Sequence, residues 1–465
     1  MNHRPRADVA ENDTIAAIST PYGEGGIGIV RLSGPESIHI TDRVFRAAAG
    51  RPLEACDSHT IHYGMIHSDG TDIDEVLVSV MRAPRTYTRE NIVEINAHGG
   101  MAAVRWILEL VLQRGARLAE RGEFTQRAFE NGRITLDQAK SVADIIHART
   151  RLGLEVAVRQ LRGRFSDEVD LIRSRIQAAV AVLEVGIDYP EIDLETDPYS
   201  EQPATQLEDI LERIADLRHQ AEHGRILREG FVITLIGRPN AGKSTLFNAL
   251  LAENRAIVTP VPGTTRDTIE AEITLSGIPV SLIDTAGLRS TDDVVEAEGV
   301  QRAERAVQRA DLLLLLVDAS EELTGDDRSL LDRAWERPVI SILAKSDLPA
   351  RTTPHTHTLL RDALPLAAEK REGLDVLRDL LEERLVRSGV PQRQSTLYLD
   401  VWETDRLQRM QQSVSRALEG LEIGKTPDMV IEDLRTSLRT AAELQGIDIG
   451  DETLAEIFRT FCVGK

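Results

Sequence analysis

The residues with the clearest chemical pattern run from Gly237 to Ser244 and read GRPNAGKS. Apolar and β-branched residues from Phe231 to Ile236 precede them and predict a buried strand, and a helix is expected to begin at Thr245. Strand, glycine-rich loop and helix in this order are typical of a phosphate-binding loop, whose backbone N–H groups converge on phosphate oxygens at a helix N-terminus. The segment therefore predicts a nucleoside triphosphate site.

The side chains of this loop have separate predicted roles. Lys243 would place its charge on the outer phosphates, and the Ser244 hydroxyl would bind Mg²⁺. Their neighbours in the loop and the first helical turn are predicted to contact the nucleotide as well: Asn240, Ala241, Gly242 and Thr245.

Three segments further along complete the pattern of a GTPase. The segment GTTRD offers Thr265 as a second magnesium hydroxyl, and the segment DTAG places Asp284 at a strand end, where it can reach magnesium through water. The segment KSD ends another strand, and the Asp347 carboxylate can accept hydrogen bonds from N1 and N2 of guanine. The nucleotide is therefore predicted to be GTP. The remaining predicted contacts in these segments are Thr285, Ala286, Gly287 and Lys345.

Two positions depart from this pattern. Leu288 stands where Ras-like enzymes carry the glutamine that orients the attacking water. Another group must then do so, and the following loop offers four acidic candidates: Asp292, Asp293, Glu296 and Glu298. Ala344 stands where an asparagine normally braces the base-binding loop to the phosphate loop, which predicts weaker nucleotide binding with guanine preference retained.

The rest of the chain predicts two further kinds of structure. Strand-like segments fill residues 13 to 100, and a helix is expected over 101–113, which indicates an α+β domain. We interpret Gly25-Gly26 and Gly99-Gly100 as ordinary tight turns, with close backbone approach as the alternative. Long helices follow from Gly122, with apolar residues at four-three spacing from Phe165 to Leu183.

Helical patterns return after the nucleotide-binding segment, from about residue 395. Because so short a block is small to fold alone, we predict that the nucleotide domain is inserted into one helical bundle; two separate helical domains are the alternative. The predicted domains are 1–121 (α+β), 122–224 (first helical part), 225–389 (doubly wound, Ras-like GTPase domain) and 390–465 (second helical part). The fold class is thus multidomain, α/β plus α.

Composition limits the function classes. The chain has 465 residues, a formal net charge of −21 and two cysteines, which make neither a disulfide framework nor a metal cluster. No apolar stretch approaches the roughly 20 residues of a membrane span, and none follows the basic N-terminus as in a secretory signal, so we expect a cytoplasmic protein that binds no membrane. Arginines between Arg149 and Arg164 form either a solvated helix face or an RNA-facing strip.

Several motifs together resemble the MnmE (TrmE) family of bacterial tRNA-modification GTPases over essentially the whole chain. They are PNAGKST, GTTRD, DTAGLR, GGIGIVRLSG, AHGG, RGEFTQRAF and the terminal FCVGK. The resemblance implies that the N-terminal domain binds tetrahydrofolate (5-formyl or methylene) and forms a homodimer. It also implies a heterotetramer with an MnmG-like flavoprotein, which carries FAD. The tRNA substrate would be modified at C5 of the wobble uridine, with GTP hydrolysis driving a conformational change.

The resemblance also implies roles for individual residues. Folate contacts are expected at Arg31, Glu94, Arg133 and Lys465. A potassium site that stimulates GTP hydrolysis is expected at Asn240, Thr259, Val261 and Thr264, and Thr259 and Thr264 are expected to contact GTP. Glu296 falls on the water-orienting glutamate of the family, and Cys462 serves either as a nucleophile or as a small packing residue.

Two other function classes were weighed. A GTP-switched binding module of the Era type would carry an RNA-binding appendage with its own signature, which the sequence does not show. A structural dimer with a vestigial GTPase is disfavoured because Lys243, Ser244, Thr265 and Asp284 are intact.

Overall fold

The computed structural model describes residues 13–188, 203–253, 269–285, 304–333, 337–387, 396–447, 449–459, 461 and 464. The chain divides into two compact units. The first comprises residues 1–143, 161–178 and 435–465, and the second comprises residues 144–160 and 179–434. The four predicted domain ranges stay a prediction.

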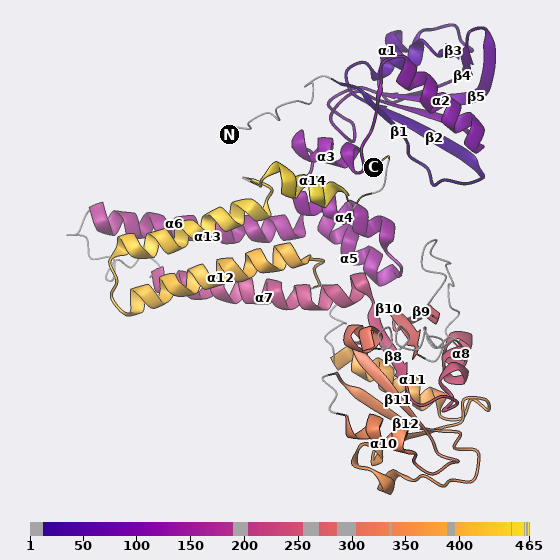
Figure 1. The fold of residues 1–465 in the computed structure, drawn as a ribbon. Coiled ribbons are helices and arrows are strands. Elements are labelled where there is room, and N and C mark those ends of the chain that lie inside the picture. Colours follow the sequence, from indigo (N-terminus) through magenta and orange to yellow (C-terminus); the bar gives the residue numbers. More distant parts are fainter. Residues whose placement is uncertain are drawn as a thin grey trace. The chain divides into compact units, whose positions relative to one another are not determined.

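The first unit contains a seven-stranded sheet in the order β3-β4-β5-β6-β2-β1-β7 (Figure 1). Its strands are β1 (Ile15–Ile18), β2 (Gly25–Ser33), β3 (Phe45–Ala47), β4 (Thr60–Ser68), β5 (Thr71–Met81), β6 (Ile92–Gly99) and β7 (Arg117–Leu118). All neighbours are antiparallel except β1 and β7. Helix α1 (Ser37–Asp42) follows β2, and helix α2 (Met101–Gln113) has the predicted bounds.

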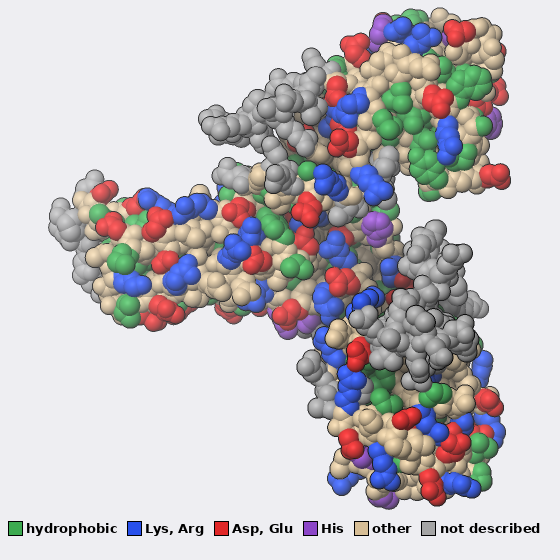
Figure 2. Space-filling model, in the orientation of Figure 1, with side chains coloured by type: hydrophobic (Ala, Val, Ile, Leu, Met, Phe, Trp, Pro, Cys, Tyr) green, Lys and Arg blue, Asp and Glu red, His purple; other side chains and the backbone are tan. Residues whose placement is uncertain are grey.

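One face of this sheet is covered and the other is partly open. Val30, Val78 and Ile95 on the strands join Ile107 and Val111 of α2 in one buried cluster. On the opposite face three large apolar side chains stay exposed: Ile61 (66%), Tyr63 (53%) and Leu77 (48%). Figure 2 shows hydrophobic side chains gathered on the part of the molecule where Figure 1 labels strands β1 to β5. A half-open antiparallel sheet of this kind alternates buried and exposed residues along each strand.

The tight-turn interpretation is wrong for Gly25 and Gly99. Both are strand residues, and they pair with one another across β2 and β6, next to a bulge before Gly28. A Cβ on Gly99 would lie 2.2 Å from the carbonyl oxygen of Gly25, so the backbones approach too closely for any side chain.

Helices make up most of the remaining first unit. They are α3 (Glu123–Glu130), parts of α4 (Leu136–His147), α6 (Arg164–Asp188) and α13 (Pro427–Leu444), and α14 (Asp451–Arg459). The predicted apolar repeat of α6 is confirmed, since Phe165, Val169, Ile172 and Ile176 are at most 1% exposed. Burial of this stripe supplies the hydrophobic stabilisation of the helix.

The second unit contains a six-stranded sheet in the order β13-β12-β11-β8-β10-β9. Its strands are β8 (Phe231–Ile236), β9 (Ile269–Leu275), β10 (Ile278–Asp284), β11 (Leu312–Asp318), β12 (Val339–Ala344) and β13 (Leu364–Leu366). All pairs are parallel except β9 with β10. The predicted range of β8 is confirmed.

Both faces of this sheet are buried. Leu312, Leu314 and Leu316 of β11 belong to one apolar cluster, and the alternating Leu313 and Leu315 belong to another. Helices α8 (Lys243–Glu253) and α11 (Leu374–Arg387) contribute to the first cluster, and α10 (Gly325–Asp332) contributes to the second. The continuous apolar run of β11 is therefore that of a central parallel strand, and the predicted doubly wound fold is confirmed.

Two long helices on either side of this sheet in the sequence pack against each other. Helix α7 (Pro203–Glu229) precedes β8, and helix α12 (Val401–Glu422) follows α11; they lie side by side (Figure 1). Arg218 of α7 donates a hydrogen bond to Gln411 of α12. Helix α5 (Arg151–Leu161) is tied to the segment just before α12, because Gln160 exchanges hydrogen bonds with the backbone of Tyr398. Helices that precede and follow the six-stranded sheet in the sequence therefore pack together.

Candidate functional site

The phosphate-loop candidate lies between β8 and α8. Gly237 has φ +152°, and a Cβ there would lie 2.5 Å from the carbonyl oxygen of Leu316, so the loop needs glycine at this position. Asn240 and Gly242 also have positive φ, +63° and +93°. Helix α8 begins at Lys243, two residues before the predicted start, because the N–H of Leu246 already donates to the carbonyl of Gly242 at 2.9 Å.

Lys243 is buried, and its Nζ is held inside the loop. It donates to the carbonyl oxygens of Gly237 and Arg238 at 2.8 and 2.7 Å. The ammonium therefore lies in the concave part of the loop. A phosphate oxygen that enters the loop can replace one of the two carbonyl oxygens as its hydrogen-bond acceptor. Ala241 at the turn is fully buried.

An oxygen pair lies at the start of α8. The Ser244 hydroxyl donates to Asp284 Oδ2 at 2.7 Å, and Asp284 is fully buried at the end of β10. The adjacent Thr285 hydroxyl donates to the carbonyl of Leu235 and fixes the end of that strand against β8. A hydroxyl and a carboxylate are hard oxygen donors of the kind that Mg²⁺ prefers, so this pair fits the predicted magnesium site.

The base-loop candidate follows β12. Ala344 is buried at the strand end, and a Cβ on Gly242 would lie 3.7 Å from the Cβ of Ala344, so the two loops are in contact range. Lys345 has φ +56° and its Nζ lies 2.7 Å from Asp318 Oδ2. Asp347 Oδ2 lies 3.1 Å from Lys370 Nζ, so this carboxylate forms an ion pair.

A second cluster forms in the first unit from segments far apart in sequence. Arg31 on β2 donates from Nε to Glu94 Oε1 on β6 at 2.8 Å, and from Nη1 to the carbonyl oxygen of Gly464 at 3.3 Å. The Ser19 hydroxyl donates to the same carbonyl at 3.1 Å. Gly464 is thus docked beside two of the predicted folate residues.

Aromatic side chains hold this docked segment. Phe458 and Phe461 are 1% and 3% exposed, with ring centroids 5.3 Å apart. Gly122 must be a glycine because a Cβ there would lie 2.6 Å from the Phe458 carbonyl oxygen, and its φ is +71°. Docking therefore depends on a glycine at the start of α3 and on an apolar face of α14.

Sequence reasoning missed two aromatic residues that connect the predicted folate contacts. The Arg31 guanidinium lies 5.7 Å from the centre of the Phe124 ring, and that of Arg133 lies 4.7 Å from the Tyr87 ring. Tyr87 packs against the cluster that contains Phe124. Cation–π contacts thus orient both guanidinium groups, and the phenylalanine of the RGEFTQRAF motif was the available signal.

Two family models together match nearly the whole chain. A model described as the GTP-binding protein TrmE N-terminus matches residues 14–133, and a model described as the MnmE helical domain matches residues 136–462. The tRNA modification GTPase MnmE of Streptococcus thermophilus is 44% identical over 456 residues, which cover 98% of this chain and 99% of that protein. The chain belongs to the MnmE family.

Other relatives match over a similar span. MnmE of Carboxydothermus hydrogenoformans is 44% identical over 97% of this chain and 99% of its own, and MnmE of Bacillus subtilis is 42% identical over 97% and 100%. A structure of Aquifex aeolicus Era bound to GDP.AlF4⁻ covers 39% of this chain and 66% of its own, at 24% identity and a TM-score of 0.27, which is too low to carry an argument. As a member of the MnmE family, the chain is a GTP hydrolase.

Part of the predicted sites lies outside the described residues. These positions are Thr259, Val261, Thr264, Thr265, Ala286, Gly287, Glu296, Cys462 and Lys465. Among the described residues, no group of three or more His, Cys, Asp and Glu side chains is arranged to hold a metal ion. Within the same residues, every helix is too short or too polar to cross a lipid bilayer.

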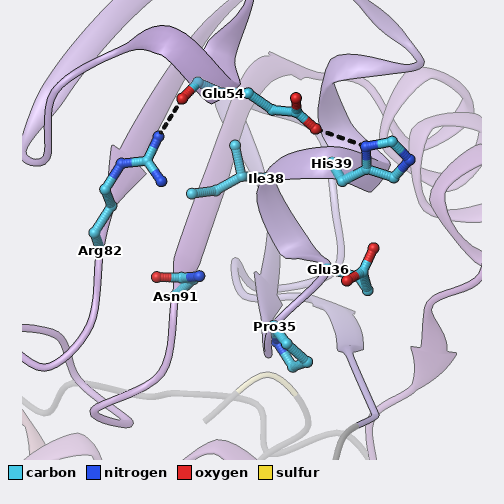
Figure 3. Close-up of a pocket in the computed structure, with 7 residues that line it drawn as sticks. All are labelled: Pro35, Glu36, Ile38, His39, Glu54, Arg82 and Asn91. Atoms are coloured by element: carbon cyan, nitrogen blue, oxygen red, sulfur yellow. Dashed lines mark hydrogen bonds and ion pairs between the residues drawn. The ribbon is translucent and has the colours of Figure 1, made fainter.

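A cavity of about 370 Å³ lies in the first unit, away from the residues discussed so far (Figure 3). It is lined by Pro35, Glu36, Ile38, His39, Glu54, Arg82 and Asn91. His39 Nδ1 lies 2.7 Å from Glu54 Oε1, and Arg82 donates to the carbonyl of Glu54 at 2.8 Å. Since these groups satisfy one another, the cavity is not assigned a ligand.

Proposed function

We propose that this MnmE-family chain is a potassium-stimulated GTPase that modifies C5 of the wobble uridine of certain tRNAs. It would act with an MnmG-like flavoprotein that carries FAD, and would use a one-carbon unit borne by 5-formyl- or methylene-tetrahydrofolate. GTP hydrolysis drives a conformational change, and the protein acts in the cytoplasm. Family membership over the whole chain supports the proposal, together with a phosphate loop and a docked C-terminus in the same chain.

The GTP site would use the loop between β8 and α8. The Lys243 ammonium binds the outer phosphates, and the Ser244 hydroxyl with Thr265 holds Mg²⁺, which neutralises phosphate charge. Asp347 selects guanine. Asn240 and the segment Thr259–Thr264 would bind K⁺, and Glu296 would orient the attacking water.

The folate site would be built around Arg31 and Glu94. The Arg31 guanidinium is 18% exposed and already paired with Glu94, so it presents a fixed charge to a folate carboxylate or ring acceptor. Arg133 is held by Tyr87. Arg31 donates a hydrogen bond to the carbonyl oxygen of Gly464. This contact would bring the neighbouring Lys465, and Cys462, to the same site.

The proposed homodimer would form through the first sheet. Tyr63 on β4 faces Leu77 on β5 in register, and both are exposed. Exposed apolar side chains that adjoin on a sheet face are typical of an interaction surface, and a second copy of the chain would cover them. Equilibrium sedimentation of Leu77→Lys would show a monomer if this face is the interface.

Two measurements test the proposed function. First, tRNA from a strain that lacks this chain should lose the C5-modified wobble uridine by nucleoside mass spectrometry, and the loss should be reversed by the intact chain. Unchanged tRNA would favour a GTP-switched binding module. Second, GTP hydrolysis should be faster in KCl than in NaCl at equal ionic strength. Equal rates would reject the proposed potassium site.

A further inference from the structure

The asparagine that normally braces the base loop is replaced by Ala344, yet charged side chains join the same two loops. Arg238 lies in the phosphate loop, and Lys345 lies in the base loop. Both reach Asp318 at the end of β11: Lys345 Nζ lies 2.7 Å and Arg238 Nη2 lies 3.9 Å from Asp318 Oδ2. One buried carboxylate therefore lies between a cation from each loop.

Arg238 is anchored at several points. Its guanidinium lies 3.3 Å from Asp327 Oδ2 through Nε and is also paired with Glu321. The hydrogen bond that Arg238 donates to Glu321 and the charges of Asp327, Glu321 and Asp318 raise the pKa of Arg238, although burial opposes this. Asp327 is 2% exposed and completes the capping box of Thr324 at the start of α10, so this ion pair links the guanidinium to a helix end.

The backbone of Arg238 faces the nucleotide side. Its carbonyl oxygen accepts from Lys243 Nζ at 2.7 Å and from the Ala241 N–H at 3.3 Å. A shift of this residue would therefore move the groups that are proposed to bind phosphate. The side chain and the backbone of one residue thus couple the loop to Asp318.

Asp318 is suited to the central position. It is 2% exposed, and its other oxygen accepts from the N–H and hydroxyl of Ser320. Burial raises its pKa, but the hydrogen bonds from Lys345 and Ser320 outweigh burial and hold the pKa below its usual value. The carboxylate is therefore charged at neutral pH and attracts both cations in a site of reduced dielectric constant.

We propose that Arg238 is a positioning residue that braces the phosphate loop to the base loop through Asp318 and Lys345, in place of the absent asparagine. This inference rests on the proposed GTP site. Because the brace contacts neither the base nor the terminal phosphate, it preorganises the site for GDP and GTP alike. It therefore sets the affinity for both nucleotides.

The test measures binding of fluorescent GDP and GTP to the full chain. Arg238→Ala should weaken both nucleotides by about tenfold. Arg238→Lys keeps the charge but loses the forked donors of the guanidinium, so its nucleotide affinity should lie between those of wild type and Arg238→Ala. The control is Arg328→Ala, an exposed arginine of α10, which should bind as wild type.

A second substitution separates bracing from general folding. In the Arg238→Ala background, Ala344→Asn should restore affinity by about fivefold, and in the wild-type background it should add less than about twofold. Equal effects in both backgrounds would overturn the proposal, as would Arg238→Ala binding like Arg328→Ala or losing GTP affinity alone. Lys243→Ala tests the site itself: unchanged binding in that variant would reject the proposed GTP site instead.

Discussion

The two candidate sites of this chain are built in opposite ways. The nucleotide site is local, because Gly237, Lys243 and Ser244 lie within eight consecutive residues of one strand–loop–helix unit. The C-terminal site is assembled from residues hundreds of positions apart: Arg31 and Gly464 are separated by 433 residues.

The difference shows what each site depends on. A phosphate loop needs backbone N–H groups and one helix end, so its geometry follows from local glycines and a buried strand. The C-terminal site needs several long-range contacts at once, because Gly464 is held by Ser19 and Arg31, which lie near the other end of the chain. We therefore expect the first site to respond to changes within the loop, and the second to respond to changes in its distant supports.

The largest expected effect is on the local site. Lys243→Ala removes the charge proposed for the phosphates, and we expect GTP hydrolysis to fall by about 10²–10³-fold, the scale of an electrostatic group in a transition state. Steady-state phosphate release measures this effect. Lys425→Ala, an exposed lysine after α12, is the control and should hydrolyse GTP at the wild-type rate. A Lys243→Ala rate near wild type would mean that phosphate is bound elsewhere.

The next effect concerns a support of the assembled site. Arg127 on α3 pairs with Asp13, Glu90 and Glu123, and its side chain is 10% exposed. Arg127→Met removes one of the two arginines that pair with Asp13 and Glu123, together with the partner of Glu90, and should lower the free energy of unfolding of the first unit by about 3 kcal/mol at pH 7, as for other broken buried pairs. Urea denaturation measures the loss. Arg105→Met, on an exposed position of α2, serves as the control.

The same network predicts a pH dependence. Burial raises the pKa values of Asp13 and Glu123, but hydrogen bonds from Arg117 and the charge of Arg127 outweigh it and hold both below their usual 3.8 and 4.5. Since the folded pKa values are lowered, this stabilisation is present above the unfolded values and is lost as the pH falls through the folded ones. Arg127→Met should therefore lose less stability than wild type between pH 6 and pH 3. Parallel losses would assign the acid sensitivity to other carboxylates.

The smallest effect is on docking itself. Gly464 has φ +86°, and a Cβ there would lie 2.4 Å from the carbonyl oxygen of Ile18. Gly464→Ala should weaken docking by about 1–2 kcal/mol, through backbone strain and this clash. Hydrogen exchange of α14 should then be faster. Gly424→Ala is the matched control, because Gly424 also has positive φ (+69°) but nothing lies within 4 Å of its Cβ position. Equal exchange rates of α14 in the two variants would show that the clash with Ile18 does not weaken docking.

This contrast also explains how far the sequence could predict the molecule. The bounds of β8 and α2 and the buried stripe of α6 follow from local periodicity and were predicted. The pairing of Gly25 with Gly99 was not predicted, because a glycine pair in a sequence does not reveal which distant backbone approaches it.

The charged partners show the same limit. Arg238 and Asp318 are 80 positions apart, and Arg149 of the arginine-rich segment is paired with Glu272, so charge patterns along one segment could not identify either contact. The predicted folate residues follow only from resemblance, and sequence reasoning missed Tyr87 and Phe124, which lie against the guanidinium groups of Arg133 and Arg31.

We propose that this chain carries two separable sites, one for GTP and one for tRNA modification. Arg31→Gln separates them, because it removes the charge between Glu94 and the Gly464 carbonyl but leaves the phosphate loop intact. The measurement is the C5-modified wobble uridine in tRNA from cells whose only copy carries this variant, beside GTP hydrolysis by the same purified chain. We expect the modification to be lost while GTP hydrolysis stays within about twofold of wild type. Normal modification, or an equal fall of both activities, would contradict it.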